Sequence, residues 1–323
     1  MAGSDARERT ALVITVLNEA ESIDALLESI AQQTWLPDEV AVVDGGSRDC
    51  TLARLEAWQG RLPLRVLQAP GSTIARGRNV AIGATTADLI AVTDAGVRLA
   101  PDWLANLRAC LSASVDVVSG FFVPDVHTSF ERAMAATVLP DLEDVQPERF
   151  LPSSRSVLFR RSAWDAVGGY PEWLDYCEDL VFDLDLKRGG SRFAFAPDAV
   201  VWFRPRGSLL AFFKQYFRYA RGDGKAGLWL GRHAIRYGVY ALALLLARRG
   251  PLAWVVLVAG GFAYTRRPYQ RLAPLLRDLP AHEQARAALL VPVIRLVGDV
   301  AKMFGFPTGI AWALRQWICR SSS

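Results

Sequence analysis

The sequence predicts an α/β protein, in which a mainly parallel sheet flanked by helices is followed by an apolar helical C-terminal region. Short apolar runs alternate with helix-like segments through the first half of the chain, which is typical of βαβ units. These runs read as buried on both faces, which favours parallel strands. The third observation is a change of composition after Arg232, where long segments carry almost no charge.

The strands and helices are expected to alternate up to about residue 111. Strands are expected over residues 11–17, 39–43, 64–68 and 88–93, and helices over residues 21–33, 51–58, 74–84 and 101–111. From about residue 115 the order is more mixed, with strand-like residues 115–122 and 156–159 on either side of an acidic loop at 141–148. We therefore predict one domain over residues 1–232, divided near residue 115, and a helical region over residues 233–323.

The bulk composition describes a chain with a real core and no nucleic-acid partner. Of the 323 residues 51% are hydrophobic, and the formal net charge is only +4 with both signs abundant. The four cysteines are scattered without a zinc or disulfide spacing, so a reducing compartment is the default. The polar N-terminus lacks the pattern of a secretory signal, and we expect the globular part to face the cytoplasm.

Polar residues close three of the expected strands. Asn18 and Glu19 follow the first, Asp44 and two glycines follow the second, and Asp94 follows the fourth. Ligands bind at the carboxyl ends of the strands in sheets of this class, so all three endings should converge on one crevice.

Asp44 has two readings. A carboxylate after a buried strand can accept hydrogen bonds from a base or ribose, while Gly45 and Gly46 let a ligand approach the backbone. Alternatively, the segment is an Asp and Gly turn in which Ser47 or Asp49 caps the next helix. A capping role for Asn18 is likewise set against a ligand contact, and Glu19 carries the same ambiguity.

Asp94 stands where a carboxylate would meet a diphosphate, whose charge must be neutralised by a metal or by fixed cations. Arg76 and Arg78 begin the preceding helix and are within reach of the same crevice. The alternative is that both arginines only solvate that helix.

Glu178 and Asp179 open a helical stretch that carries four carboxylates. Carboxylates at this position also stabilise a helix through its dipole, which is the structural alternative. The neighbouring Trp173, Tyr176 and Phe182 make a partly desolvated site, in which a carboxylate with a raised pKa acts as a general base. Further along, Gln215, Arg218 and Arg221 share a helical spacing with several aromatic residues, a pattern that also fits a basic amphipathic helix on a membrane.

Seven motifs in this order resemble those of the family-2 glycosyltransferases, inverting enzymes with a GT-A fold. They are TVLNE at 15–19, VDGGS at 43–47, ARGRN at 75–79, TDAG at 93–96, GGY at 168–170, ED at 178–179 and QYFRY at 215–219. The likeness covers residues 12–225, about two thirds of the chain. Under this resemblance residues 10–114 form the donor half and residues 115–232 the acceptor half of the domain.

The resemblance implies a nucleotide-sugar donor, a UDP-sugar first and a GDP-sugar second. Asp44 would contact the nucleotide base, with Asn18 or Glu19 lining the same pocket. Arg78 would lie near the donor, and Asp94 would match the first acid of the DxD motif, which faces the ribose and a diphosphate bridged by Mn²⁺ or Mg²⁺.

The resemblance also assigns the chemistry to the ED motif. Asp179 would deprotonate the acceptor hydroxyl in a single displacement with inversion, and Glu178 would hold the acceptor or shape the base. Gln215 and Arg218 would lie near the diphosphate or the acceptor. The sequence departs from the pattern in two places, since Gly96 replaces the second acid of DxD and Tyr219 stands where processive members have Trp. The second departure disfavours processive polymerisation.

Two apolar segments, residues 237–247 and 250–265, indicate contact with a membrane. Neither reaches the length of about 20 residues that spanning requires. Arginines flank both segments and also stand between them at Arg248 and Arg249, which opposes a spanning hairpin with cytoplasmic ends. We expect a hairpin lying in the cytoplasmic leaflet, with two short spans or a buried helical pair as alternatives. This location suits a glycan or lipid-linked acceptor near the membrane.

Other functions receive less support. A nucleotidyltransferase would place a Gly-rich basic loop after the first strand, where this chain has Asn18 and Glu19. A dinucleotide dehydrogenase would need GxGxxG there, and it is absent. A non-catalytic sugar-nucleotide sensor or membrane scaffold is favoured only by Gly96.

Overall fold

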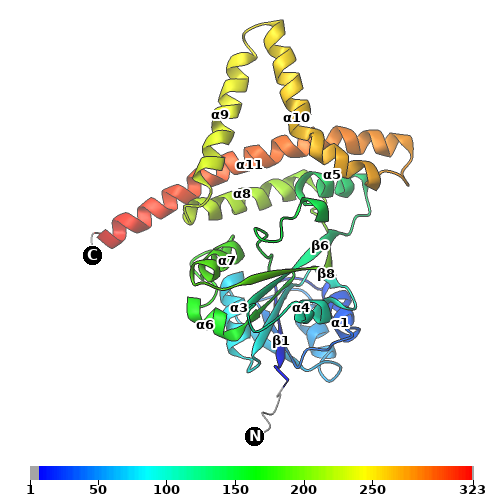
Figure 1. Cartoon of the computed structure of the whole chain (residues 1–323), viewed down its shortest axis with the longest axis vertical. Helices are drawn as coiled ribbons and strands as arrows, with labels where there is room; N and C mark the ends of the chain where they lie inside the picture. The colour runs from blue at the N-terminus through cyan, green and yellow to red at the C-terminus, as the bar shows by residue number, and fades with distance from the viewer. Residues whose placement is uncertain (1–6, 322–323) are drawn as a thin grey trace. The chain divides into compact units, whose positions relative to one another are not determined.

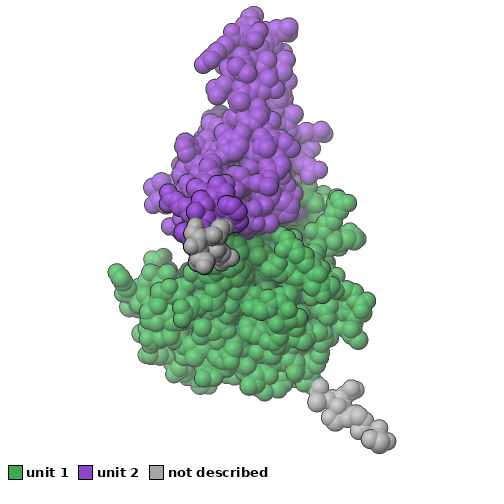
Figure 2. Space-filling view, turned by 90° about the vertical axis from the view of Figure 1, so that its left-hand side faces the viewer, with its two compact units in different colours: residues 1–123, 142–203 green, residues 124–141, 204–323 purple. Residues whose placement is uncertain are grey.

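The computed structural model describes residues 7–321, with side chains to residue 319, and divides into two compact units. Unit 1 comprises Met1–Val123 and Leu142–Phe203, and unit 2 comprises Pro124–Asp141 and Arg204–Ser323 (Figure 2). Compactness therefore groups residues 204–232 with the C-terminal helices, whereas the predicted domain limit at residue 232 followed composition.

Unit 1 is built on an eight-stranded sheet in the order β3-β2-β1-β4-β7-β6-β8-β5. The strands are β1 Thr10–Val16, β2 Glu39–Asp44, β3 Leu64–Gln68, β4 Leu89–Asp94, β5 Val97–Leu99, β6 Val117–Pro124, β7 Val157–Arg160 and β8 Phe193–Phe203. The first four are parallel, as predicted, but β7 is antiparallel to β4 and β6, and β5 is antiparallel to β8.

The expectation of a mainly parallel sheet is thus right for one half and wrong for the other, so the sheet is mixed. Its physical reason is that the βα repeat stops at β4. After β4 no helix leads to a further parallel neighbour, because β5 follows after only two residues and pairs with the distant β8.

The helices of unit 1 cover both faces of the sheet (Figure 1). They are α1 Ile23–Ala31, α2 Thr51–Ala57, α3 Ile74–Gly83, α4 Trp103–Ala109, α6 Arg161–Val167 and α7 Glu178–Arg188. Along β1, Leu12, Ile14 and Val16 pack with α1, α2 and α4, while Ala11 and Val13 pack with α3, α6 and α7. This alternation follows from the two-residue period of a strand and produces two cores.

The register of the central strands places the predicted crevice. Val16 pairs with Asp44 across β1 and β2, and Thr15 pairs with Asp94 across β1 and β4. The two aspartates therefore close strands on either side of β1 at the same edge, as the sequence predicted. Gly77 lets α3 approach this edge, because a Cβ there would lie 2.8 Å from Cγ2 of Thr15.

Unit 2 is helical. It contains α5 Ser129–Val138, α8 Leu209–Lys225, α9 Leu230–Leu246, α10 Pro251–Leu275 and α11 Ala281–Ser321. The two apolar segments form α9 and the first part of α10, joined at a turn that holds Arg248 and Arg249 (Figure 1). The 237–265 hairpin predicted from the sequence is therefore present as a helical pair.

The helices of unit 2 bury little of their apolar surface. A small core of α5, α8, α10 and α11 residues includes Met134, Phe212, Leu272 and Ile294. In contrast, the large side chains of the hairpin are exposed, with Leu252 78%, Phe262 72% and Val258 66% accessible. Within residues 7–321, none of the helices combines the length and the apolar character needed to cross a membrane.

Candidate active site

The turns after β1 and β2 are tied together by short polar side chains. Asp44 is buried, and its carboxylate accepts hydrogen bonds from the backbone N–H groups of Gly46 at 3.1 Å and Ser47 at 3.0 Å. Asn18 adopts a left-handed φ of 56°, donates its N–H to Oγ of Ser47 at 2.8 Å and accepts from the N–H of Arg48 at 2.9 Å. These contacts hold the backbone of the two turns in place at the edge of the sheet where a nucleotide base is expected to bind.

The structure also tests whether Ser47, Asp49 or Asn18 caps a helix. The N-cap of α2 is Cys50, and Asp49 accepts from the N–H of Thr51 inside the turn, so neither Ser47 nor Asp49 is the N-cap. The N-cap of α1 is Ser22 rather than Asn18. Glu19 supports that helix start, since its Oε2 accepts from Oγ of Ser22 at 2.5 Å.

A buried arginine joins the end of β4 to the start of α7. Arg78 is 4% exposed, and its two terminal nitrogens pair with Oε1 of Glu178 at 2.8 Å and with Oδ1 of Asp94 at 2.9 Å. Asp94 is 34% exposed and meets a second cation, since Nε of Arg155 lies 3.5 Å from its Oδ2. The structure thus brings together three predicted site residues from α3, β4 and α7.

Asn79 joins two of the motifs, ARGRN at 75–79 and GGY at 168–170, which are far apart in the sequence. Its Oδ1 accepts from the N–H of Tyr170 at 2.9 Å, and its Nδ2 donates to the carbonyl oxygen of Tyr170 at 2.9 Å. Gly169 has a φ of 83°, and a Cβ there would lie 2.8 Å from Oδ1 of Asn79, so glycine is required. Tyr170 in turn packs beneath Arg78, with the guanidinium 5.2 Å from its ring centroid.

The carboxylates of α7 divide into two kinds. Burial and the neighbouring Asp179 raise the pKa of Glu178 to about 7, although Arg78 opposes the shift. Burial and Asp179 also raise the pKa of Asp183 well above its usual range, and Oδ2 of this residue has no hydrogen-bond partner. Asp179 is half-buried at the positive end of the helix dipole, where its Oδ1 accepts from the N–H of Leu180. The raised pKa that we expected for a carboxylate at this helix start is therefore found at Glu178.

Two site residues escaped the sequence reasoning. Arg155 precedes β7, which runs antiparallel to β4, so the residues just before β7 lie beside those just after β4. Asp183 lies one helical turn after Asp179, a spacing that was visible in the sequence. Of the two predicted arginines of α3, Arg78 is buried in ion pairs whereas Arg76 is exposed, as the solvation alternative predicts.

A divalent ion would find one protein ligand at this edge. No group of three or more His, Cys, Asp or Glu side chains that could hold a metal exists within residues 7–321. Nevertheless Asp94 is a third exposed and keeps acceptor capacity beyond its two arginines, because a carboxylate has about four lone-pair sites. Mg²⁺ is usually held by one or two carboxylates together with substrate phosphates, so the residues fit an ion bound largely by its ligand.

The remaining predicted residues belong to unit 2. Gln215 and Arg218 lie on α8, where Nε2 of Gln215 donates to the hydroxyl of Tyr219 at 2.8 Å. Gln215 is half-buried and Arg218 is exposed. Their roles near a diphosphate or acceptor stay predictions.

Family models match most of the chain. Glycosyl transferase family 2 matches residues 11–164, and glycosyl transferase family group 2 matches residues 89–298. Among named relatives, succinoglycan biosynthesis protein ExoA of Rhizobium meliloti is 29% identical over 66% of this chain and 68% of its own. Glycosyltransferase AglE of Haloferax volcanii is 30% identical over 72% of this chain and 78% of its own.

The fold has solved counterparts. Mannosyltransferase PcManGT from Pyrobaculum calidifontis, solved with GDP-Man and Mn²⁺, superposes with a TM-score of 0.56 and 19% identity over 93% of this chain and 88% of its own. S. aureus TarS 1-349 superposes with a TM-score of 0.52 and 18% identity over 95% and 91% of the two chains.

These matches confirm the resemblance that the seven motifs indicated, because the family models cover the residues that form the sheet and the ion-paired edge. The chain belongs to glycosyl transferase family 2 and is a glycosyltransferase that transfers a sugar from a donor.

Proposed function

We propose that this enzyme is an inverting, non-processive hexosyltransferase that moves a sugar from a nucleotide-sugar donor to an acceptor hydroxyl near a membrane. A UDP-sugar is the first candidate donor and a GDP-sugar the second, as in the GDP-Man complex of the mannosyltransferase from P. calidifontis. The observation that carries the proposal is the pair of contacts by which the buried Arg78 joins Asp94 at the end of β4 to Glu178, the neighbour of Asp179 at the start of α7.

Asp179 is the proposed base. Its carboxylate is half-buried and accepts one backbone hydrogen bond, whereas Glu178 beside it is buried and ion-paired to Arg78. A group that removes a proton from an acceptor must be reachable, and Asp179 is more accessible than the buried Glu178. Glu178 therefore positions the base, and Asp179 takes the acceptor proton while the oxygen attacks the anomeric carbon opposite the leaving diphosphate.

The edge of the sheet at the carboxyl ends of β1, β2 and β4 would bind the donor and balance the negative charge of its diphosphate. Asp44, Asn18 and Glu19 fix the turns where the nucleoside would bind, and Asp94 faces the diphosphate. When Mn²⁺ or Mg²⁺ is bound, it neutralises charge that develops on the departing diphosphate, with Asp94 as its protein ligand. Arg155 adds a fixed cation at the same place. Arg78 is committed to Asp94 and Glu178, so its role is to hold these carboxylates rather than the donor.

The hairpin supports a membrane-proximal, lipid-linked or glycan acceptor. Its exposed leucine, valine and phenylalanine side chains would be stable in a lipid interface, and arginines stand at its base and its turn. We propose that α9 and α10 lie in the cytoplasmic leaflet, with unit 1 on the cytoplasmic side.

The test is release of nucleoside diphosphate by the purified protein in detergent, with UDP-, GDP- and dTDP-sugars, with and without Mn²⁺ or Mg²⁺. Asp179→Asn should lower turnover of the accepted donor by about 10²- to 10⁴-fold, because it removes the base. Asp185→Asn is the matched control, since Asp185 lies on the same helix and pairs with the exposed Arg188. Turnover by Asp179→Asn at the parent rate would assign the base to another residue, and failure of every donor to bind would overturn the proposal.

A further inference from the structure

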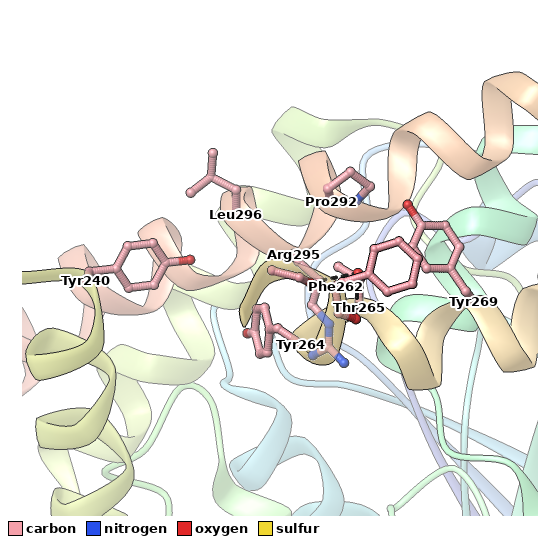
Figure 3. Close-up of a pocket in the computed structure, with 9 residues that line it drawn as sticks. Tyr240, Phe262, Tyr264, Thr265, Tyr269, Pro292, Arg295 and Leu296 are labelled. Atoms are coloured by element: carbon pink, nitrogen blue, oxygen red, sulfur yellow. Dashed lines mark hydrogen bonds between the residues drawn. The ribbon is translucent and has the colours of Figure 1, made fainter. Parts of the chain in front are cut away.

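A pocket of about 480 Å³ lies between α9, α10 and α11 of unit 2 (Figure 3). Its walls are aromatic and aliphatic, and a single cation enters it. The lining includes Tyr240, Phe262, Tyr264, Tyr269, Arg295 and Leu296. A volume of this size is in the usual range of about 300–1,000 Å³ for small-ligand pockets.

Arg295 is the unusual member of this lining. Its Nε is buried without a hydrogen-bond partner, and no carboxylate within residues 7–321 forms an ion pair with it. Its guanidinium instead lies 4.9 Å from the ring centroid of Tyr264, and Figure 3 shows the two side chains next to each other. A guanidinium in apolar surroundings is costly unless an anion accompanies it.

The nearest acidic residue along the helix is already occupied. Asp299 is buried, and its Oδ1 accepts from Nε of Arg236 at 2.9 Å. Its Oδ2 accepts from the hydroxyls of Tyr264 at 2.6 Å and Tyr240 at 3.1 Å. Arg236 therefore balances Asp299, and the charge of Arg295 is left for a ligand.

The pocket continues into an apolar surface. Phe262 also lines a second hollow on α10 together with Trp254, Val255 and Val258. These side chains are between 54% and 72% exposed. A ligand anchored by an anionic group at Arg295 would thus find hydrocarbon contacts leading away from the pocket.

The charge of the whole unit favours an anionic partner. Unit 2 holds twenty lysines and arginines against seven aspartates and glutamates, a formal net charge of +13. Basic residues near a membrane surface attract anionic lipids. An apolar path next to an unpaired arginine on a basic helical unit matches the two parts of a phospholipid.

We propose that this pocket binds the phosphate of an anionic phospholipid at Arg295, with the acyl chains lying along Phe262, Val258 and Trp254. The site rests on the proposed membrane association of the hairpin, which brings the lipid to it. It gives the helical unit a specific headgroup contact in addition to its general attraction to the membrane.

The experiment uses the full chain and a short-chain lipid, dihexanoyl phosphatidic acid, below its micelle concentration, with calorimetry as the readout. Arg295→Gln should weaken this binding about tenfold or more, because a charge-assisted contact is lost. Arg286→Gln is the matched control, since Arg286 lies on the same helix, is 66% exposed and pairs with Glu283. Arg295→Lys should recover part of the binding, and Phe262→Ala, at an exposed position, should weaken it without affecting folding.

Several results would overturn the proposal. These are equal binding by the parent and Arg295→Gln proteins, binding of dihexanoyl phosphatidylcholine as tight as that of phosphatidic acid, binding of inorganic phosphate as tight as that of the lipid, and no binding at all. Each sample is also assayed for donor turnover and for co-sedimentation with phosphatidylcholine and phosphatidylglycerol vesicles. Donor turnover without lipid binding rejects only the pocket, whereas loss of vesicle binding rejects the membrane role of the hairpin.

Discussion

Unit 1 and unit 2 distribute charged and apolar side chains in opposite ways. Unit 1 has seventeen basic against twenty-six acidic residues, a net charge of −9, whereas unit 2 has a net charge of +13. In unit 1 the residues of the central strands β1, β2 and β4 are almost all buried, and so are Arg78 and Glu178. In unit 2 Glu131 and Asp299 are buried as well, but large apolar side chains such as Leu252 and Phe262 face outward.

The two units are therefore stabilised by different interactions. Unit 1 depends on two apolar cores and on buried ion pairs that cannot be broken singly without leaving an uncompensated charge. Unit 2 depends on close backbone packing between long helices, and many of its large apolar side chains are exposed and so contribute little to folding. The following predictions test this contrast, from the largest expected effect to the smallest.

Arg78→Met should have the largest effect. It removes the guanidinium that pairs with Glu178 at 2.8 Å and one of the two that pair with Asp94 among the described residues, so both carboxylates lose a partner. Breaking a buried pair from one side costs about 3–5 kcal/mol. Urea denaturation should show this loss, whereas Arg54→Met, which breaks the exposed pair with Asp24, should cost under about 1 kcal/mol. Equal losses from the two changes would contradict the contrast.

Gly305→Ala should be the most harmful small change in unit 2. A Cβ at Gly305 would overlap the carbonyl oxygen of Phe217 where α11 crosses α8, and Gly309 and Gly224 make the same kind of approach. Overpacking costs about 1–3 kcal/mol, which exceeds the gain of about 1 kcal/mol from replacing a helical glycine. Gly238→Ala on α9 meets no atom within 4 Å, so it should be neutral or stabilising. The midpoints of thermal unfolding of the two variants distinguish the cost of overpacking at Gly305 from the gain in helix propensity at Gly238.

The pH dependence of stability should come from α7. Burial raises the pKa of Glu178 to about 7 and that of Asp183 well above its usual range, so the folded chain binds protons that the unfolded chain has already lost. Stability should therefore fall as pH rises from about 4.5 to 7 and above. Glu178→Gln and Asp183→Asn should each flatten this slope, measured by urea midpoints across pH. A slope unchanged in both variants would place the titration elsewhere.

The sequence predicted the local features of unit 1 well. Every expected helix of the first half is present within two residues of its predicted bounds, and the βα repeat corresponds to four parallel strands. The antiparallel half was not predictable from periodicity, because the pairing of β7 with β4 and β6 joins segments far apart in the chain.

The sequence predicted which residues form the site better than it predicted their burial and ion pairs. Asp94, Arg78 and Glu178 were expected from strand ends and motifs, and they are in contact. Arg155 was missed because its position depends on the antiparallel strand that follows it. A raised pKa was expected for a carboxylate at the start of this helix, and Glu178 has one. The raised pKa of Asp183 was not expected, because its burial depends on how α7 packs.

Leu252→Ser should have the smallest effect on folding and a clear effect on membrane binding. Leu252 begins α10 and is 78% exposed, so the folded chain gains almost nothing from its side chain and the change should stay within about 0.5 kcal/mol. Leu26 lies in α1 and has no exposed surface. Leu26→Ser should lower the free energy of unfolding several-fold more than Leu252→Ser does, because it removes core packing and buries a hydroxyl. On vesicles of phosphatidylcholine and phosphatidylglycerol the order reverses, since Leu252 lies on the surface proposed to enter the leaflet and Leu26 does not. Loss of stability in Leu252→Ser comparable to that in Leu26→Ser would show that the hairpin packs against protein, and the contrast between the two units would then fail.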